Sequence, residues 1–181
     1  MNESPDLETW RRDLLEYRGQ KDLDFAKDPD SPLSDAEKGG FRGLVYFDPD
    51  PTYRVVARLV RIEKPQTITM DTTKPDRQMS RMKIGYLEFT LGGEKLMLYA
   101  LQGTDQGSPI SVPFTDATTG AETYHDGRYV ELEVGSDDEC TLDFNYAYSP
   151  YCAYNDRYAC LLPPPENRLR VAIRAGEKKF H

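Results

Sequence analysis

The sequence predicts a mainly β protein, an antiparallel small barrel or sandwich with an N-terminal α-helix docked outside. Three observations support this fold class. About seven short runs rich in β-branched residues follow Tyr53, separated by turn residues. One helical pattern precedes them. Twelve tyrosines and seven phenylalanines accompany a single tryptophan, and aromatic rings are frequent in strands. Short strands with tight turns are typical of barrels and sandwiches.

The length of 181 residues fits a single domain, 1–181. Three parts are expected within it: an N-terminal helix over residues 4–19, a turn-rich connector over 20–52, and a β domain over 53–181. The chain contains no internal repeat and no low-complexity linker that would suggest a second domain.

The first segment has start and stop signals for a helix. Ser4 can cap it, Pro5 suits the first helical position, and Gly19 can end it. Apolar side chains recur at helical spacing on one face, at Leu7, Trp10, Leu14 and Tyr17. We therefore expect this helix to dock on the domain.

The connector should contain one short helical turn. Ser34 and Glu37 have the spacing of a capping box, and Gly39 and Gly40 follow them. Prolines at positions 49 and 51 then exclude a helix before the first strand.

The β domain begins with four strand patterns. "YRVVARLVRI" and "QTITM" are β-branched runs that Pro65 separates. "RMKIGYLEFTLGGEKLMLYAL" then contains two alternating runs around residues 91–94, which predicts a hairpin.

Three further strands are expected. "RYVELEV" and "CTLDFN" alternate in polarity and are joined by "GSDDE", which predicts a second hairpin. "LRVAIRA" predicts a last strand whose inward side chains are Leu169, Val171 and Ile173.

Composition argues against several partners. A formal net charge of -8 disfavours general binding to nucleic acid or anionic membranes, which requires positive surface. No run approaches the roughly 20 apolar residues of a membrane span, and the N-terminus lacks the apolar core of a signal peptide. We expect a soluble cytoplasmic protein with reduced cysteines; the oligomeric state is left open.

Polar residues concentrate in the loop from Val112 to Leu132, "VPFTDATTGAETYHDGRYVEL". Asp and Thr side chains readily bond nearby backbone amides, so this polarity could shape the turn itself. A hydroxyl-rich turn near Arg128 could also hold an anion. Both interpretations remain open.

The stretch from Leu142 to Phe180 contains two cysteines, Cys152 and Cys160, among several tyrosines. Four roles compete: a zinc site, a nucleophilic cysteine with His125 as its base, a disulfide, and two buried thiols. Zinc sites commonly use cysteines two to four residues apart, and this spacing is absent. No nucleophile elbow supports catalysis. Buried thiols in an aromatic cluster are the preferred interpretation, and no metal site is expected.

Known nucleotide, zinc-protease and calcium motifs are absent from the sequence. Carboxylates are abundant, so a pair such as Asp143 with Glu166 could provide an acid and a base, but an acidic chain offers many such pairs. Near the end of the chain, a buried Arg–carboxylate pair is the simplest role for the charged residues, and an anion site is the alternative.

Four stretches together resemble one family: "DSPL", "GLVYFDPDPTYRV", "PFTDATTGAETYHDGRYVEL" and "LDFNYAYSPYCAYNDRYACLLPPPENRLRVAIRAGEK". They are similar to the DUF1684 family of uncharacterised bacterial and archaeal proteins, over roughly residues 8 to 180. His125 lies at a position that the family pattern leaves open, which weakens both Cys–His catalysis and zinc. The resemblance implies no activity, because the family's function is unknown.

We predict a small-molecule-binding β module in which both polar motifs converge on one pocket. The expected ligand-binding residues are Asp116, Thr118, Glu122, Arg128, Asn145, Tyr148, Glu166, Asn167 and Arg168. One alternative is an enzyme with Asp143 or Glu122 as general base and Tyr124 as hydrogen-bond donor. The second alternative is a structural or interaction protein. Flavin is considered as a cofactor only by analogy with the split barrel of flavin-binding proteins.

Overall fold

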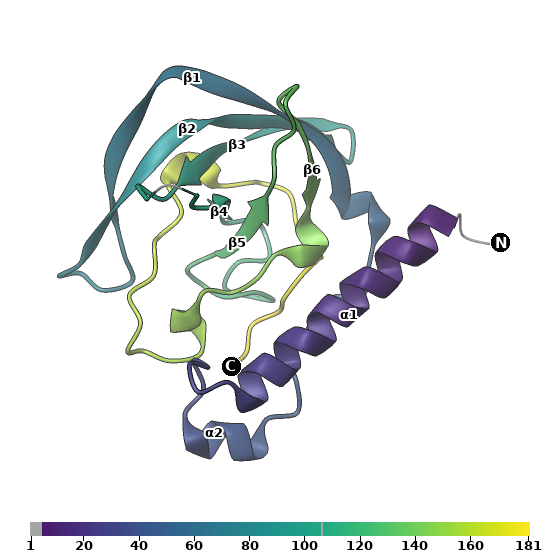
Figure 1. Cartoon of the computed structure of the whole chain (residues 1–181), viewed down its shortest axis with the longest axis vertical. Coiled ribbons are helices and arrows are strands. Elements are labelled where there is room, and N and C mark those ends of the chain that lie inside the picture. The colour runs from purple at the N-terminus through teal and green to yellow at the C-terminus, as the bar shows by residue number, and fades with distance from the viewer. Residues whose placement is uncertain (1–4, 106) are drawn as a thin grey trace.

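The computed structural model describes residues 5–105 and 107–181 and confirms the mainly β prediction. The expected cap at Ser4 lies outside the described residues. Six strands form one antiparallel sheet that curls into a half-barrel (Figure 1). Their bounds are β1 Arg54–Asp71, β2 Gln78–Leu91, β3 Glu94–Gln102, β4 Ile110–Phe114, β5 Arg128–Leu132 and β6 Glu139–Asp143.

The strand order is β5-β4-β3-β2-β1-β6, so β5 and β6 are the two edges of the sheet. The curl brings these edges near one another, as Figure 1 shows. Apolar residues from all six strands fill the concave side, among them Leu59, Leu87, Leu98, Phe114 and Leu142. The core is therefore the inside of the curl.

The long β1–β2 hairpin differs from the prediction of two separate runs. β1 passes through Pro65 without ending, and its pairing with β2 shifts register between Arg61 and Gln66. Proline cannot donate a ladder hydrogen bond, so a bulge at this place lets the strand continue. The hairpin predicted at residues 91–94 is confirmed, with β2 and β3 paired on either side of it.

The second predicted hairpin was wrong. β5 pairs with β4, and β6 pairs with β1, so the two strands do not pair with each other. The turn itself exists, because the Asp138 N–H donates to the carbonyl of Gly135. The Leu59 N–H donates to the carbonyl of Asp138, which ties this turn to β1. The connection therefore bridges the two edges of the sheet.

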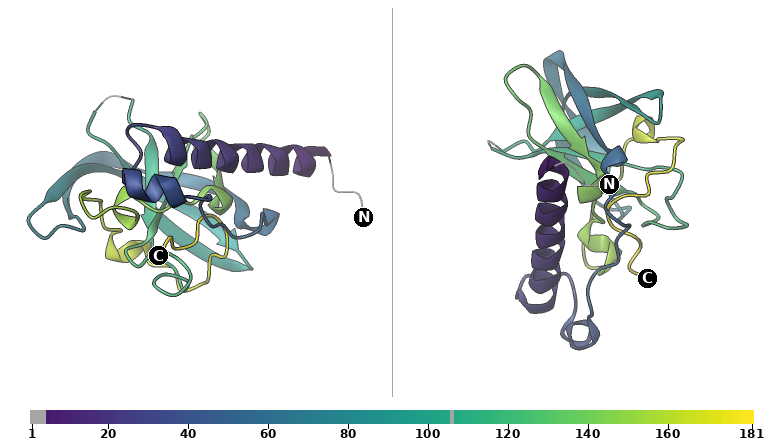
Figure 2. Two further views of the ribbon diagram at one scale, coloured as in Figure 1. Left: turned by 90° about the horizontal axis from the view of Figure 1, so that it is seen from below. Right: turned by 90° about the vertical axis from the view of Figure 1, so that its right-hand side faces the viewer.

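Helix α1 (Pro5–Lys27) lies outside the barrel, as predicted (Figures 1 and 2). It is longer than the expected 4–19, since it continues through Gly19 for two further turns. Its buried residues are Trp10, Leu14, Arg18 and Phe25. Contacts of the second half with the domain explain why Gly19 does not end the helix.

Polar contacts fasten α1 to the domain. Trp10 Nε1 donates to Asp143 Oδ2 at 2.7 Å. The Arg18 guanidinium donates to the carbonyls of Phe47, at 2.9 Å, and Asn145, at 3.2 Å. Lys21 Nζ pairs with the buried carboxylate of Glu177. These bonds fix the rotation of the helix about its axis.

The connector forms helix α2 (Asp35–Gly40), whose capping box between Ser34 and Glu37 is confirmed. A 3-10 helix, η1 (Pro51–Tyr53), leads into β1. Three more follow β6: η2 (Phe144–Tyr146), η3 (Tyr151–Ala153) and η4 (Pro165–Asn167).

The predicted last strand, "LRVAIRA", was wrong as a strand, although Leu169 and Ile173 do point inward. The first half of the segment bonds to the residues that follow β4: the Leu169 N–H donates to the carbonyl of Thr115, and the Ala117 N–H donates to the carbonyl of Val171. In the second half, the carbonyls of Ile173 and Ala175 accept hydrogen bonds from the side chain of Arg128, as does the carbonyl of Glu177 just beyond it. A guanidinium thus takes the place of a neighbouring strand in this second half.

Gly85 allows β1 and β2 to approach closely at the bend of the hairpin. A Cβ atom there would lie 2.4 Å from the carbonyl oxygen of Val60. We predict that Gly85→Ala lowers the free energy of unfolding by about 1–3 kcal/mol, because backbone must move. Urea unfolding would measure this loss.

Gly39→Ala is the matched control. Gly39 lies in α2 with nothing near its would-be Cβ, so the substitution should leave stability equal or raise it by about 0.5–1 kcal/mol. Equal effects of both substitutions would contradict the steric explanation.

Candidate functional site

Asp116 and Arg128 belong to a sealed cluster that we call the arginine latch: Arg128, Asp116 and the carbonyls of Ile173, Ala175 and Glu177. Arg128 is 1% exposed, and its nitrogens donate to all three carbonyls. Its Nη2 also lies 3.5 Å from Asp116 Oδ2, which accepts the Ile173 N–H at 2.6 Å. Burial lowers the pKa of Arg128 to about 10, which leaves it charged at neutral pH.

Thr118 shapes the turn that carries Asp116. Its hydroxyl donates to Asp116 Oδ1 at 2.8 Å and contacts the Thr123 hydroxyl at 3.0 Å. Thr118 and Thr123 are fully buried. Thr118 therefore faces the turn, not a cavity.

Asp143 and Asn145 join β6 to the connector and to α1. Asn145 donates to the carbonyl of Asp50 at 2.8 Å and accepts the Asp50 N–H at 2.9 Å. Asp143 accepts from Trp10 and from the backbone and side-chain amides of Asn145. Asp143 is buried, and these hydrogen bonds engage its carboxylate oxygens.

Asn167 holds η4 against the sheet. Its side chain accepts the Tyr99 N–H at 2.7 Å and donates to the carbonyls of Tyr99 and Pro113. It is fully buried. Glu166 and Arg168 beside it are exposed on the surface.

Glu122 and Tyr148 lie apart from these clusters. Glu122 pairs with Arg174 at 2.9 Å, and the two side chains are 38% and 58% exposed. The Tyr148 hydroxyl donates to Glu131 at 2.8 Å, and Lys21 Nζ lies 4.9 Å from the ring centroid. The predicted ligand-binding residues therefore do not converge on one pocket.

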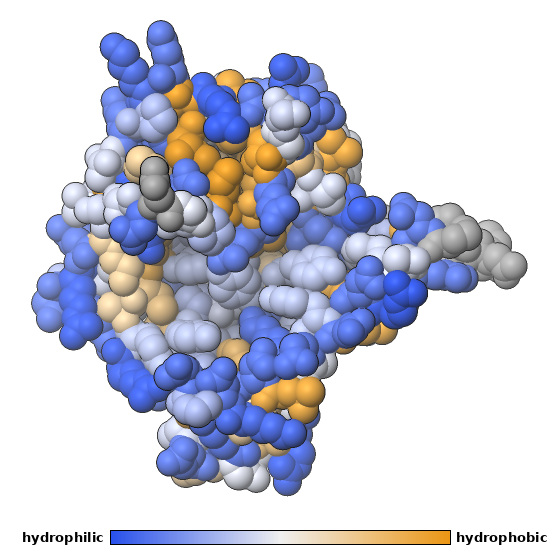
Figure 3. Space-filling model, in the orientation of Figure 1, coloured by the Kyte–Doolittle hydropathy of each residue, from blue (hydrophilic) through white to orange (hydrophobic). Residues whose placement is uncertain are grey.

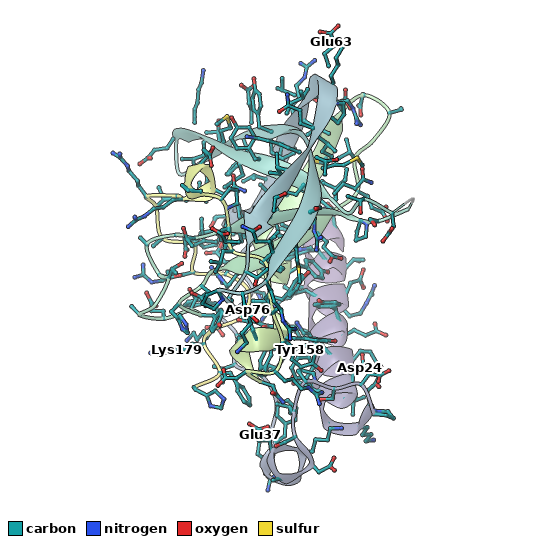
Figure 4. All side chains as sticks on the ribbon, turned by 90° about the vertical axis from the view of Figure 1, so that its left-hand side faces the viewer. Asp24, Glu37, Glu63, Asp76, Tyr158 and Lys179 are labelled. Atoms are coloured by element: carbon teal, nitrogen blue, oxygen red, sulfur yellow. The ribbon has the colours of Figure 1, made fainter. Side chains whose placement is uncertain are left out.

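Tyr124 is the predicted residue that lines a polar cavity of about 470 Å³, which we call the Cys152 cavity. Segments distant in sequence meet there. They are the β1–β2 turn (residues 73–74), the loop over 120–126, the segment 152–158 and residues 179–181. In Figure 4, Lys179 and Tyr158, which both line it, lie at a similar level below Asp76.

Cys152 lies against hydrogen-bond donors in the wall of this cavity. The Tyr124 hydroxyl is 3.5 Å from the Cys152 sulfur and 3.2 Å from Asp126 Oδ2, so sulfur and carboxylate compete for its one proton. The Cys160 sulfur is a further neighbour, because it accepts the Cys152 N–H at 3.2 Å. The Cys160 thiol, followed by the hydroxyls of Tyr124 and Thr73, lowers the pKa of Cys152 to about 6 against the opposing effect of burial.

The other two cysteines differ from Cys152. The neighbouring Cys152 thiol, followed by burial, raises the pKa of Cys160. Cys140 lies in β6, where burial raises the pKa of its thiol. All three are free thiols.

A second polar hollow, of about 540 Å³, is also lined by Cys152, together with Glu37 and Asn155. The remaining hollows on the described part of the molecule lack such a nucleophile in a polar wall. One lies between α1 and the barrel, beside Tyr17, Tyr148 and Tyr151. A shallow one of about 720 Å³ lies over β1–β3 and includes Val56 and Met97. In the upper part of Figure 3, orange hydrophobic residues gather in the region where Figure 1 draws these strands. In residues 5–105 and 107–181, no group of three His, Cys, Asp or Glu could hold a metal.

Sequence reasoning considered Cys152 and His125 but missed Thr73, Lys74 and Lys179 as cavity residues. The two lysines have no local motif around them. The bent β1–β2 hairpin brings Lys74 beside Cys152, and the residues that follow Glu177 bring Lys179 there. A contact between segments so far apart leaves no signal in one sequence.

A model of the family described as "Protein of unknown function (DUF1684)" matches residues 39–178. The chain belongs to the DUF1684 family. The solution NMR structure of an uncharacterised protein from Haloarcula marismortui is similar to this DUF1684 protein, with 42% identity and a TM-score of 0.75. The match covers 97% of each chain.

No protein with curated annotation matches this DUF1684 protein. Among its described residues, no helix has the length and apolar character needed to cross a membrane.

We predict that Arg128→Met lowers the free energy of unfolding of the DUF1684 protein by about 3–5 kcal/mol. The substitution leaves the Asp116 carboxylate and three carbonyls without their buried cation. Urea unfolding followed by Trp10 fluorescence would measure the loss.

Adding Asp116→Asn to Arg128→Met should recover part of the loss, because it removes the unpaired buried charge. Arg174→Met serves as a control, since that exposed pair should leave the unfolding midpoint unchanged. A similar midpoint for both arginine variants would refute the structural role of Arg128.

The thiol of Cys152 should react with iodoacetamide at a rate that reaches half its maximum near pH 6, because its pKa is lowered to about 6. An ordinary cysteine does so near pH ~8.5. Peptide mapping by mass spectrometry would follow Cys152, with buried Cys140 as the slow internal comparison. A midpoint above pH ~8 for Cys152 would count against the hydrogen-bonded thiolate.

Proposed function

We propose that this protein binds a small polar molecule in the Cys152 cavity. The observation that carries the proposal is the convergence of distant polar segments on one hollow of about 470 Å³. Ligand sites are commonly concave, of about 300–1,000 Å³, and few per protein. Proteins use precisely placed polar groups in such sites to orient their ligands, and this wall supplies Tyr124, Asp126 and Lys74.

The charges in the wall favour a ligand with both an acidic and a basic group. Lys74 and Lys179 are cationic, whereas Asp126 and Asp156 are anionic. Neither lysine forms an ion pair with another described residue. Lysine ammonium groups are point charges that suit a carboxylate. The aspartates can receive an ammonium group of the same molecule.

The alternative of a carboxylate general base has less support in the geometry. Asp143 is bonded to Trp10 and Asn145, and Glu122 is paired with Arg174. Neither lines the Cys152 cavity. A general base must reach the proton that it removes from a substrate. The flavin analogy stays a prediction.

Binding can be tested with three probes of similar size: the zwitterion alanylalanine, the diacid glutarate and the diamine 1,5-diaminopentane. We predict that alanylalanine shifts the amide resonances of Gly120, Tyr124 and Asp156 in ¹H–¹⁵N correlation spectra. Lys74→Ala with Lys179→Ala should weaken its binding at least about tenfold, equivalent to ~1.4 kcal/mol.

Lys64→Ala is the matched control, since Lys64 is exposed in β1 and does not line the cavity. Figure 4 places its neighbour Glu63 at the top of the molecule and Lys179 in the lower half. Absence of shifts with all three probes, or equal shifts in the lysine variant and wild type, would remove the support for this function.

A further inference from the structure

We propose that Cys152 and Cys160 form a thiol–disulfide exchange pair that reduces a low-molecular-weight aliphatic disulfide in the Cys152 cavity. The disulfide would carry amino and carboxylate groups. This inference rests on the proposed binding function and adds a reaction to it.

The two cysteines are already in contact. The Cys152 N–H donates to the Cys160 sulfur at 3.2 Å. The Cys160 N–H donates to Thr73 Oγ1 at 3.1 Å, and the Thr73 N–H donates to the carbonyl of Cys160 at 2.8 Å. The β1–β2 turn thus holds Cys160 in place beside Cys152.

The two sulfurs differ in their access to the cavity, so we assign them different roles in the exchange reaction. Cys152 lines the Cys152 cavity, whereas Cys160 does not. Cys160 borders an apolar groove of about 300 Å³ beside Met79, Tyr129 and Leu161. A sulfur bound to Cys152 from the cavity would therefore have Cys160 on the other side of Cys152. Exchange needs the attacking and leaving sulfurs on opposite sides, so Cys152 attacks first and Cys160 resolves.

The surroundings of Cys152 favour its thiolate, which is the attacking species in exchange. The Cys160 thiol, followed by the hydroxyls of Tyr124 and Thr73, lowers the pKa of Cys152, and the Tyr124 hydroxyl donates to its sulfur at 3.5 Å. The Asp126 carboxylate opposes them. The other charged or titratable groups that face the cavity are the cationic Lys74 and Lys179, the anionic Asp156, the imidazoles of His125 and His181, and the phenol of Tyr158.

The reaction is balanced without a further reagent. The Cys152 thiolate attacks one sulfur of the disulfide RSSR, an S–S bond to Cys152 forms, and one half leaves as a thiolate. Cys160 then attacks the Cys152 sulfur and releases the second half. The two cysteines are oxidised to one disulfide, RSSR is reduced to two RSH, and the two cysteine protons pass to these products.

The size and charge of the cavity favour a disulfide over a hydroperoxide. A volume of about 470 Å³ greatly exceeds the space of a peroxide group, and both charge signs are present around Cys152. The groups that would bind alanylalanine would bind the same amino and carboxylate groups on a disulfide. A peroxide would gain nothing from them.

The test uses intact-protein mass spectrometry after incubation with cystine, cystamine or 3,3′-dithiodipropionate. Wild-type protein should lose two titratable thiols and the mass of two hydrogen atoms, with Cys152 linked to Cys160. Cys160→Ser should retain one half of the probe on Cys152. Cys152→Ser should form neither product, and Cys140→Ser should behave as wild type.

Two variants of Cys160 separate resolution from activation. Cys160→Ser keeps a hydroxyl that can donate to Cys152, whereas Cys160→Ala removes the donor. Both should trap the adduct, but the alanine variant should react more slowly at pH 6 than at pH 8 by a factor of about ten or more. Equal adduct formation on Cys160 in Cys152→Ser would overturn the assigned roles, and failure of both Cys160 variants to trap an adduct would overturn the pair.

Charge selectivity distinguishes this inference from the binding function. Cystine should react about tenfold faster than the other two probes, and Lys74→Ala with Lys179→Ala should remove that difference. If alanylalanine binds but no probe oxidises the cysteines, the exchange reaction fails and the binding function stands. If the probes react equally fast in both proteins and alanylalanine does not bind, the binding function fails and the assigned substrate class fails with it.

Discussion

Arg128 carries a positive charge in the interior of the half-barrel, and the second half of the chain is arranged to satisfy its N–H groups. Its partners are three carbonyls and Asp116. A buried guanidinium without partners would cost several kcal/mol. The segment that supplies the carbonyls also places Glu177, which accepts from Ser149 N–H and Tyr154 and pairs with Lys21. The arginine latch thereby fixes both α1 and the segment that contains Cys152.

Local patterns in the sequence were sufficient for the fold class, the N-terminal helix, the capping box and the tight hairpin at residues 91–94. They failed where contacts between residues far apart in the sequence determine the structure. Gly19 favours the end of a helix, yet α1 continues past it because Arg18 and Phe25 are buried against the domain. The alternation after Leu169 correctly predicted inward residues, but alternation cannot reveal that the Arg128 side chain replaces a neighbouring strand in the second half of this segment.

The candidate site was predictable only in part, for a related reason. Polar residues such as Asp116, Asn145 and Asn167 are buried and bonded to backbone groups, and one sequence does not distinguish such residues from ligand-binding ones. Tyr124 and Cys152 were noticed because they are chemically distinctive. The lysines that complete the cavity carry no signal, since their positions depend on the bend of the β1–β2 hairpin.

The separation between Arg128 and its partners constrains how the chain can fold during synthesis. The three carbonyls lie 45 to 49 residues after Arg128. All six strands therefore leave a ribosome before the carbonyls that bond to the interior cation do. Until residues 173–177 emerge, Arg128 has Asp116 but lacks its three carbonyl partners, which disfavours closing the sheet over it. We therefore expect the core to be completed late, and chains that end shortly before these residues to keep a hydrated interior.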